Sequence, residues 1–125
     1  MIHGIGMDLV EIDRIEDSIR RFGDRFLGRI LRAEEIRYCQ GQGRPALHVA
    51  ARFAAKEAAS KAFGTGIGSD LAWLDLEVLR EPSGKPVLVL HDAGRALAEK
   101  RGVRAVHLTL THTGTTAGAT VILEG

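Results

Sequence analysis

The chain has 125 residues, 45% of them hydrophobic and 26% charged, which is enough for one globular domain with a modest core. Its formal net charge of +1 argues against a protein dedicated to nucleic acid, and the single Cys39 excludes an internal disulfide and favours a reducing compartment. The first residues lack a basic region before an apolar run, and no stretch reaches membrane-spanning length. We therefore expect one cytoplasmic domain over residues 1–125, with neither a membrane nor a nucleic acid as partner.

Residues 2–12 alternate loosely and are rich in Ile, Leu, Val and Met, which predicts a strand. A period of two puts Gly4, Gly6 and Asp8 on one face, where the glycines would leave open space beside an acid. Asp8 is therefore a candidate metal ligand with room for substrate next to it. The alternative is that Asp8 is only a polar residue at a strand end.

Arginines dominate the next two segments, a helix over about 14–22 and a short segment over 26–31. Residues 14–32 hold six Arg, no Lys and three acids, a local charge of +3. Guanidinium groups suit carboxylates and phosphates, so this surface suits an acidic macromolecular partner. An ordinary solvated face with local acid partners explains the composition equally well. The buried stripe of the helix is expected to hold Ile15, Ile19 and Phe22.

A short helix over 34–39 and a loop over 40–45 lead to the central helix, which Pro45 can begin and Gly64 can end. Alanine is so frequent in this helix that neighbouring backbone can come close on almost every side. A helix that is apolar nearly all round is normally buried, and a buried charge needs a partner or a metal.

Four charged residues interrupt the alanines of the central helix: Arg52, Lys56, Glu57 and Lys61. Glu57 and Lys61 are four residues apart and share a face, where a carboxylate and an ammonium could hold a divalent metal and a phosphate side by side. The alternative is an ordinary Glu–Lys helix pair, and the helix taken alone favours that interpretation.

The second half of the chain is mostly strand. Gly64 opens a glycine-rich turn over 64–69 that can point N–H groups at an anion, although a helix C-cap is the commoner use of such a turn. His112 lies at a strand end, where it could bind an anion, shuttle protons or be structural. The remaining expected elements are strands at 74–78, 87–90, 106–111 and 117–123, a turn at 82–86, a helix at 92–101 and a hairpin turn at 113–116.

Four segments follow one another in order: Gly4 to Glu11 (GIGMDLVE), Arg52 to Gly66, Gly84-Lys85-Pro86, and Leu110-Thr111-His112-Thr113. Together they resemble the holo-acyl-carrier-protein synthase group of 4′-phosphopantetheinyl transferases. The resemblance spans essentially the whole chain, and its F-A-A-K-E-A-x-S-K-A segment is highly specific. It implies a single α+β domain in which an antiparallel sheet packs on the long Ala-rich helix. It also implies a homotrimer with active sites shared between two subunits.

The resemblance implies an enzyme that moves 4′-phosphopantetheine from coenzyme A to a serine of apo acyl carrier protein and releases adenosine 3′,5′-bisphosphate. Asp8 and Glu57 match the family's Mg²⁺ ligands, and Lys61 matches a lysine near the pyrophosphate. These three are the expected catalytic residues. Whether a carboxylate or a metal-bound water takes the serine proton stays open.

Coenzyme A binding is implied for a wider set, partly through its 3′-phosphate: Arg52, Lys61, Gly64, Gly84, Lys85, Pro86 and His112. The surface that meets the acidic carrier protein is implied for Arg14, Arg21 and Arg25. The family's alignment is loosest over residues 33–48, so no contact is carried over there. Thr109 and Thr111 stand where Ser is common in the family, which retains the hydroxyl chemistry.

Two other functions compete with the enzyme. The first is a catalytically inactive homologue that binds coenzyme A or an acidic partner, which is disfavoured because every matched acidic and basic position is intact. The second is a small nucleic-acid-binding module built on residues 14–32. That segment offers only Phe22 and Phe26 for stacking, and the chain lacks a strong positive charge.

Overall fold

The computed structural model describes residues 1–125 and confirms most of the expected elements, with shifted ends. The expected strand at 2–12 ends one residue earlier, because Ile12 is already the first residue of a helix. In chain order the elements are β1 (Ile2–Glu11), α1 (Ile12–Phe22), α2 (Asp24–Ile30), α3 (Ala33–Gln40), α4 (Pro45–Phe63), the 3-10 turn η1 (Trp73–Asp75), β2 (Leu76–Arg80), β3 (Pro86–Leu90), α5 (Asp92–Lys100), β4 (Ala105–His112) and β5 (Thr116–Glu124).

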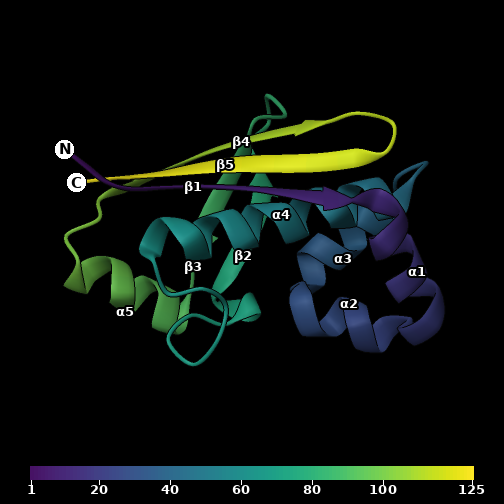
Figure 1. Cartoon of the computed structure of the whole chain (residues 1–125), viewed down its shortest axis with the longest axis horizontal. Coiled ribbons are helices and arrows are strands. Elements are labelled where there is room, and N and C mark those ends of the chain that lie inside the picture. The colour runs from purple at the N-terminus through teal and green to yellow at the C-terminus, as the bar shows by residue number, and fades with distance from the viewer.

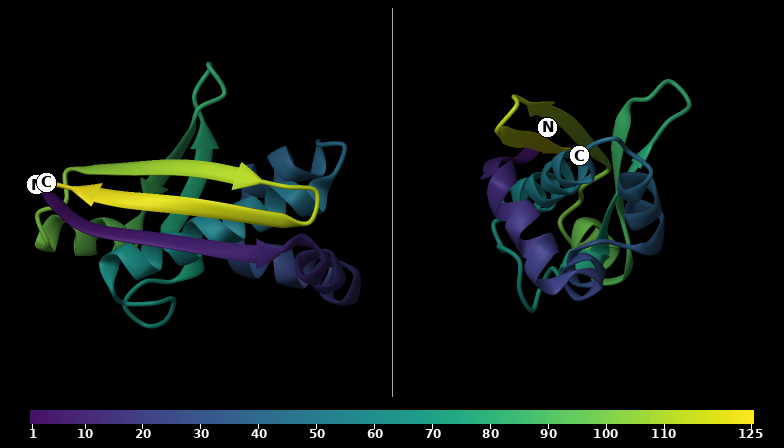
Figure 2. Two further views of the ribbon diagram at one scale, coloured as in Figure 1. Left: turned by 45° about the horizontal axis from the view of Figure 1, so that its top comes forward. Right: turned by 90° about the vertical axis from the view of Figure 1, so that its right-hand side faces the viewer.

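The strands form two antiparallel sheets rather than the one expected. β1, β5 and β4 make a three-stranded sheet in that order, while β2 pairs only with β3. The β2–β3 hairpin crosses the other strands steeply, so it is not hydrogen-bonded to them (Figure 1). The α+β class and the antiparallel pairing are confirmed. Figure 2 shows that the turn of this hairpin projects beyond the three-stranded sheet.

Helix α4 lies directly beneath the three-stranded sheet, with helices α1 to α3 gathered at one end of it (Figure 1). The contact is very close at β1, because a Cβ at Gly4 would lie 2.0 Å from the Ala62 carbonyl oxygen. A Cβ at Gly6 would lie equally close to the Ala58 oxygen. The expectation of open space beside these glycines is therefore wrong. They let strand backbone touch helix backbone, and Asp8 follows on the same face.

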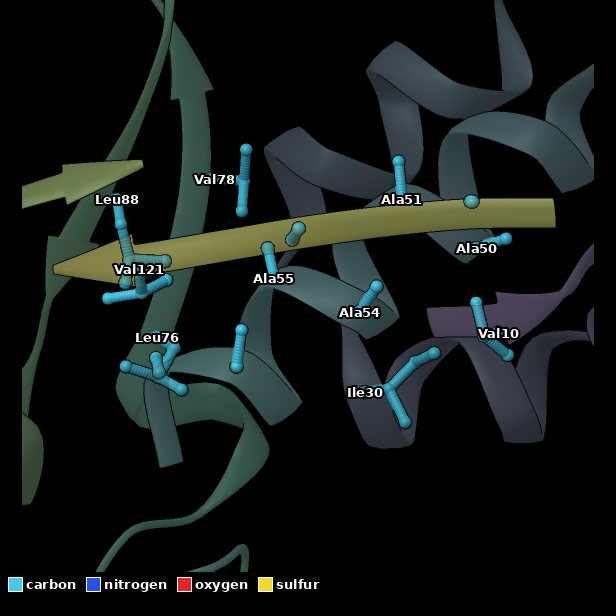
Figure 3. Close-up of a cluster of buried hydrophobic side chains, with 14 of the residues drawn as sticks. Val10, Ile30, Ala50, Ala51, Ala54, Ala55, Leu76, Val78, Leu88 and Val121 are labelled. Atoms are coloured by element: carbon cyan, nitrogen blue, oxygen red, sulfur yellow. The ribbon is translucent and has the colours of Figure 1, made fainter. Parts of the chain in front are cut away.

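The core is built mainly from small residues of α4 and the inner face of β5. Figure 3 shows Ala50, Ala51, Ala54 and Ala55 of α4 gathered around the β5 strand, which contributes Val121. β2 and β3 close the core from the side, and α2 closes it from below. Because alanine adds so little bulk, the helix and sheet can pack with their backbones close together.

Lys56 is fully buried on α4, and Glu35 of α3 is its partner. The Lys56 ammonium donates to Glu35 Oε1 at 2.8 Å and to the carbonyl oxygens of Ile30 at 2.7 Å and Trp73 at 3.2 Å. Glu35 also accepts hydrogen bonds from the backbone N–H groups of Arg32 and Val78. A buried charge was expected to have a partner, and Lys56 finds its partners within the protein. Its hydrogen bonds attach α4 to three other segments. No helix combines the length and the apolar character needed to cross a membrane.

Candidate active site

Asp8 and Lys61 meet where β1 passes over the last turns of α4. The Lys61 ammonium donates to Asp8 Oδ1 at 3.0 Å and to the Met7 carbonyl oxygen at 3.1 Å. The side chain of Asp8 is 16% exposed and that of Lys61 is 52% exposed, so the pair borders solvent. Glu57 precedes Lys61 by one helical turn but forms no ion pair with it. An ordinary Glu57–Lys61 helix pair is therefore not the arrangement in the structure.

The two carboxylates of this cluster are close enough to disturb each other. Burial raises the pKa of Glu57, the negative charge of Asp8 raises it further, and Lys61 partly opposes both. Two carboxylates that share a site are stabilised by a cation placed between them. Since no group of three acidic, His or Cys side chains gathers anywhere, a cage made only of protein ligands is absent. Two carboxylates suit Mg²⁺, which commonly takes its other ligands from water and substrate phosphates.

A second group of site residues lines a hollow of about 270 Å³ on the other side of α4. The hollow brings together Arg52, Pro86 and His112, which the sequence singled out in three separate segments. It also contains Arg80 and His48, which the sequence analysis missed. His48 lies one helical turn before Arg52, and that spacing was the available signal. The full lining is Leu47, His48, Ala51, Arg52, Arg80, Pro86, Leu110, Thr111 and His112.

The hollow is cationic and holds no carboxylate. Arg52 is 1% exposed, and its Nη1 donates to the His48 carbonyl oxygen at 3.3 Å, while its buried Nε has no partner. Arg80 donates to the Gly84 carbonyl oxygen at 2.6 Å, and neither arginine forms an ion pair. Burial lowers the pKa of His48, and the positive charges of Arg52, Arg80 and His112 lower it further. Such a pocket is complementary to an anion.

Gly64, Gly84 and Lys85 were also expected to bind coenzyme A, and they lie in three different places relative to the hollow. Gly64 has a φ of 78° and ends α4, and its N–H donates to the Lys61 carbonyl oxygen at 3.0 Å. That N–H is therefore not free to bind an anion, and the C-cap interpretation is correct. Gly84 adjoins the hollow through its bond from Arg80, whereas Lys85 is exposed on the projecting turn and does not line the hollow.

The Asp8 cluster and the cationic hollow lie on opposite sides of the chain. Asp8 is on β1 and His112 is on β4, which are the two edge strands, with β5 between them. On α4, Glu57 follows Arg52 by five residues, which turns it about 140° around the helix axis. One copy of the chain therefore does not bring all the expected site residues together.

A third feature is a hollow of about 530 Å³ lined by Ser18, Phe22, Arg25, Phe26 and Arg29 of α1 and α2. Phe22 is 52% exposed, so the expectation that it belongs to the buried stripe is wrong. Helix α1 ends at Gly23, whose φ of 55° turns the chain, and α2 then fills the core instead with Leu27 and Ile30. Phe22 is left at the surface with the Arg21 guanidinium 5.4 Å from its ring centre.

Acidic neighbours neutralise only part of this arginine-rich surface. Asp17 pairs with Arg20 at 2.6 Å and lies 3.7 Å from Arg21. Arg14 and Arg25, the other two arginines expected to meet a partner, form no ion pair. The surface therefore keeps free positive charge around an exposed aromatic side chain.

Comparison with known proteins links these features to one family. The model of the 4′-phosphopantetheinyl transferase superfamily matches residues 4–115. A holo-[acyl-carrier-protein] synthase from Koribacter versatilis is 53% identical over 124 residues, which cover 99% of each chain. The crystal structure of holo-[acyl-carrier-protein] synthase from Neisseria meningitidis aligns with a TM-score of 0.93 at 37% identity over 100% of both chains. A holo-(acyl-carrier-protein) synthase from Bacillus anthracis, in complex with CoA (3′,5′-ADP), aligns with a TM-score of 0.82 at 41% identity over 98% of this chain and 96% of that one.

Proposed function

The chain belongs to the 4′-phosphopantetheinyl transferase superfamily, and we propose that it acts as a holo-[acyl-carrier-protein] synthase. It transfers 4′-phosphopantetheine from coenzyme A to a serine of apo acyl carrier protein, giving holo carrier protein and adenosine 3′,5′-bisphosphate. The observation that carries this function is similarity to holo-[acyl-carrier-protein] synthases along nearly the full length of the chain. The expected family is confirmed. Residues 1–125 would form the single transferase domain of a cytoplasmic protein that serves fatty acid or polyketide synthesis.

In the proposed site, Asp8 and Glu57 hold Mg²⁺, for which their shared negative charge is suited. The ion would supply charge neutralisation and orientation at the pyrophosphate of coenzyme A. Lys61 is anchored by Asp8 and by the Met7 carbonyl oxygen, so its ammonium is held in place beside the carboxylates. There it would neutralise the charge that develops on the leaving adenosine 3′,5′-bisphosphate. Phosphoryl transfer depends chiefly on this kind of positioning and charge stabilisation.

The trimer and its shared active sites are supported by the outer face of the three-stranded sheet. Ile5, Met7 and Leu9 point away from α4 and are each more than 60% exposed. Large exposed apolar side chains in a row are typical of a surface that another copy covers. Sharing also explains why the Asp8 cluster and the cationic hollow lie on opposite edges of one sheet. In a closed ring, the Asp8 cluster of one protomer would face the hollow of the next.

We expect light scattering to give a mass of three chains for the wild type and a smaller mass for the variant Met7→Asp. A charge in the middle of the apolar face should oppose burial of that face. The same variant should lose transferase activity as the protein is diluted, because its sites would be incomplete. Arg95→Asp, on the exposed surface of α5, serves as the matched control and should keep the wild-type mass. A wild-type mass of one chain would refute the trimer.

The carrier protein is proposed to dock on the α1–α2 surface that contains Arg14, Arg21 and Arg25. Carrier proteins of this kind are acidic, and exposed arginines steer acidic partners and suit their carboxylates. The hollow beside Phe22 adds an apolar contact at the centre of the charged rim. Aromatic residues and arginine are enriched at the centres of protein interfaces, and the rim around them is polar.

Charge reversal by Arg14→Glu or Arg21→Glu should raise KM for the carrier protein while KM for coenzyme A changes by less than about twofold. Loss of electrostatic steering typically lowers the association rate by about 10-fold or more at low salt. The effect should shrink as salt is added, because exposed charges are screened. Steady-state kinetics at two ionic strengths would check this, with Arg95→Glu as the control. An unchanged KM for the carrier would count against the proposed docking surface.

The function itself is tested by mass spectrometry of apo acyl carrier protein incubated with this protein, coenzyme A and Mg²⁺. The expected result is a mass gain of one phosphopantetheine, which a chelator prevents. Carriers of the fatty-acid type and of the polyketide type should both be tried, because the proposed function covers either. If coenzyme A binds but no carrier gains mass, the inactive binding homologue becomes the better description.

A further inference from the structure

We propose that Gly6 is a positioning residue that sets the separation between the Asp8 and Glu57 carboxylates, and so selects Mg²⁺ over a larger divalent cation. It would do this by fixing how far β1 lies from α4. The inference rests on the proposed function, because it takes Asp8 and Glu57 as the metal ligands. It gives a task in the site to a residue that has no side chain.

At Gly6 the backbone of β1 touches the backbone of α4. A Cβ at this position would lie 2.0 Å from the Ala58 carbonyl oxygen and 2.7 Å from the Ala62 nitrogen. Both atoms belong to the helix backbone, so no side chain can turn aside to make room. A side chain at position 6 would therefore push β1 and α4 apart by more than about 1 Å before the contact reached an ordinary separation of about 3.5 Å.

This contact lies directly beside the proposed metal site on both elements. On α4, Ala58 follows Glu57 in the chain. On β1, Asp8 is the next residue after Gly6 on the face that points to α4, about 7 Å along the strand. The Lys61 ammonium joins the two elements by donating to Asp8 Oδ1 at 3.0 Å. A change of spacing at Gly6 would therefore be transmitted to the carboxylates.

Of the two elements, β1 is the one that would move. The hydrogen bonds of Lys56 to the Ile30 and Trp73 carbonyl oxygens and to Glu35 attach α4 to the rest of the core. In contrast, β1 is an edge strand that is hydrogen-bonded to β5 alone. Displacing β1 would carry its carboxylate away from the one on α4 and widen the gap that a cation would bridge.

The width of such a gap selects a cation by its size. Mg²⁺ binds oxygen ligands at about 2.0–2.1 Å in a strict octahedron, whereas Ca²⁺ binds them at about 2.3–2.6 Å with flexible geometry. A close approach of β1 to α4 therefore favours Mg²⁺, and a wider separation favours Ca²⁺. Gly6→Ala should shift the preference of the site toward the larger ion. A residue needed only for folding would not change that preference.

Calorimetric titration of the protein with Mg²⁺ and with Ca²⁺, in the presence of coenzyme A and without carrier protein, tests this role. Gly6→Ala should weaken Mg²⁺ binding by about 10-fold or more, while Ca²⁺ binding changes by less than about threefold. The double variant Gly6→Ala/Asp8→Glu should recover part of the lost Mg²⁺ affinity, because the longer side chain reaches back across the wider gap. Asp8→Glu alone should weaken Mg²⁺ binding.

Two other glycines provide matched controls. A Cβ at Gly4 would lie 2.0 Å from the Ala62 carbonyl oxygen, so Gly4→Ala should cost a similar amount of stability. Gly4 is about 13 Å along the strand from Asp8, so its substitution should change the ratio of Mg²⁺ to Ca²⁺ affinity less. Gly28 lies on α2 with no atom near its missing Cβ, and Gly28→Ala should bind both ions as the wild type does.

An unchanged ratio of Mg²⁺ to Ca²⁺ affinity in folded Gly6→Ala, or an equal change in Gly4→Ala, would overturn the role of Gly6. Thermal unfolding identifies a variant that does not fold. If Gly6→Ala does not fold, Glu57→Asp becomes decisive, because it widens the same gap from α4 and leaves the backbone contact intact. It should shift the preference toward Ca²⁺, and an unchanged ratio would overturn the inference.

The proposed function fails in a different way from this inference. If the enzyme is active and the ratio of affinities does not change, only the role of Gly6 is refuted. If coenzyme A and metal bind but no carrier protein gains mass, the function is refuted and the metal titrations still decide the role of Gly6. If the wild type binds neither ion, the inference is refuted and the transfer assay alone decides the function.

Discussion

Asp8→Asn and Glu57→Gln should each lower kcat/KM for transfer by about 10²- to 10³-fold, the typical cost of removing one group that stabilises developing charge. Each change keeps the shape of the side chain and removes one of the two negative charges proposed to hold Mg²⁺. Affinity for Mg²⁺ or Mn²⁺ should fall in parallel, which calorimetry can measure without any turnover. Mass spectrometry of the carrier protein with time gives the transfer rate.

Glu99→Gln provides the matched control for these variants, since Glu99 is an exposed carboxylate on α5 far along the chain from the cluster. It should retain wild-type kinetics and metal affinity. The proposed metal role would be refuted if Asp8→Asn and Glu57→Gln bound the metal normally, or if a chelator left transfer by the wild type unchanged. If the variants lost transfer but bound the metal normally, Asp8 and Glu57 would be needed for the reaction in a role other than metal binding.

Glu57→Gln should lose activity without losing stability. The reason is the way in which the Glu57 carboxyl makes the free energy of unfolding depend on pH. The folded-state pKa of Glu57 lies above its unfolded value, because burial and Asp8 disfavour the charged form. A raised carboxyl pKa means that its contribution to stability is complete below the unfolded pKa and is lost as pH rises through the folded one. In the presence of a chelator, the wild type should therefore lose stability relative to Glu57→Gln as pH rises above the pKa of an unfolded glutamate, about 4.3. Urea unfolding of both proteins at each pH would measure this, and equal pH profiles would contradict it.

Local signals in the sequence were sufficient to predict most of the helices and strands. Alternation predicted β1, Pro45 and Gly64 bounded α4, and turn residues predicted both hairpins, because these features depend on neighbours within a few residues. The same reasoning found the Arg52, Glu57 and Lys61 positions, because an otherwise apolar helix makes its charges conspicuous. It could not say which of those charges faces which neighbour.

The remaining features depend on contacts between distant segments. Gly4 and Gly6 looked like space for a ligand, but α4 fills that space, since a strand glycine gives no indication of what approaches it. Arg80 and Tyr38 are 42 residues apart and meet only because β2 and α3 both pack beside α4. The expectation for Phe22 was wrong because the chain turns at Gly23, directly after it. Leu27 and Ile30 of α2 then fill the core, and Phe22 stays exposed. The periodicity of a sequence does not show which distant segments come into contact.

The largest effect on stability is expected at Lys56 and Glu35, the buried ion pair of the core. Lys56→Met should lower the free energy of unfolding by about 3–5 kcal/mol, the usual cost of leaving one member of a buried pair without its partner. The side chain of Glu35 is inaccessible to solvent, so no water replaces the lost ammonium. Urea unfolding at one fixed protein concentration would measure the change, since assembly makes stability depend on concentration.

Two further variants separate the charge from the hydrogen bonds. Glu35→Gln removes the charge but keeps only one oxygen, so it can accept from either the Arg32 or the Val78 backbone N–H, which donate to Oε1 and Oε2 respectively. The double variant Lys56→Met/Glu35→Gln removes both charges. The double variant should cost less than the sum of the two single variants, because neither charge is then left alone. Arg95→Met, which breaks only an exposed pair with Glu99, should change stability by less than about 0.5 kcal/mol.

A value for Lys56→Met within about 1 kcal/mol of the wild type would contradict the structural role of the pair. The result also bears on catalysis, because Lys56 lies on α4 between Arg52 and Glu57. Its three hydrogen bonds hold the helix to α2, α3 and η1, and so fix the direction in which those two neighbours point. In the proposed enzyme, Lys56 would act on the reaction only through this anchoring. Any Lys56→Met protein that still folds should therefore show weaker coenzyme A binding and slower transfer together.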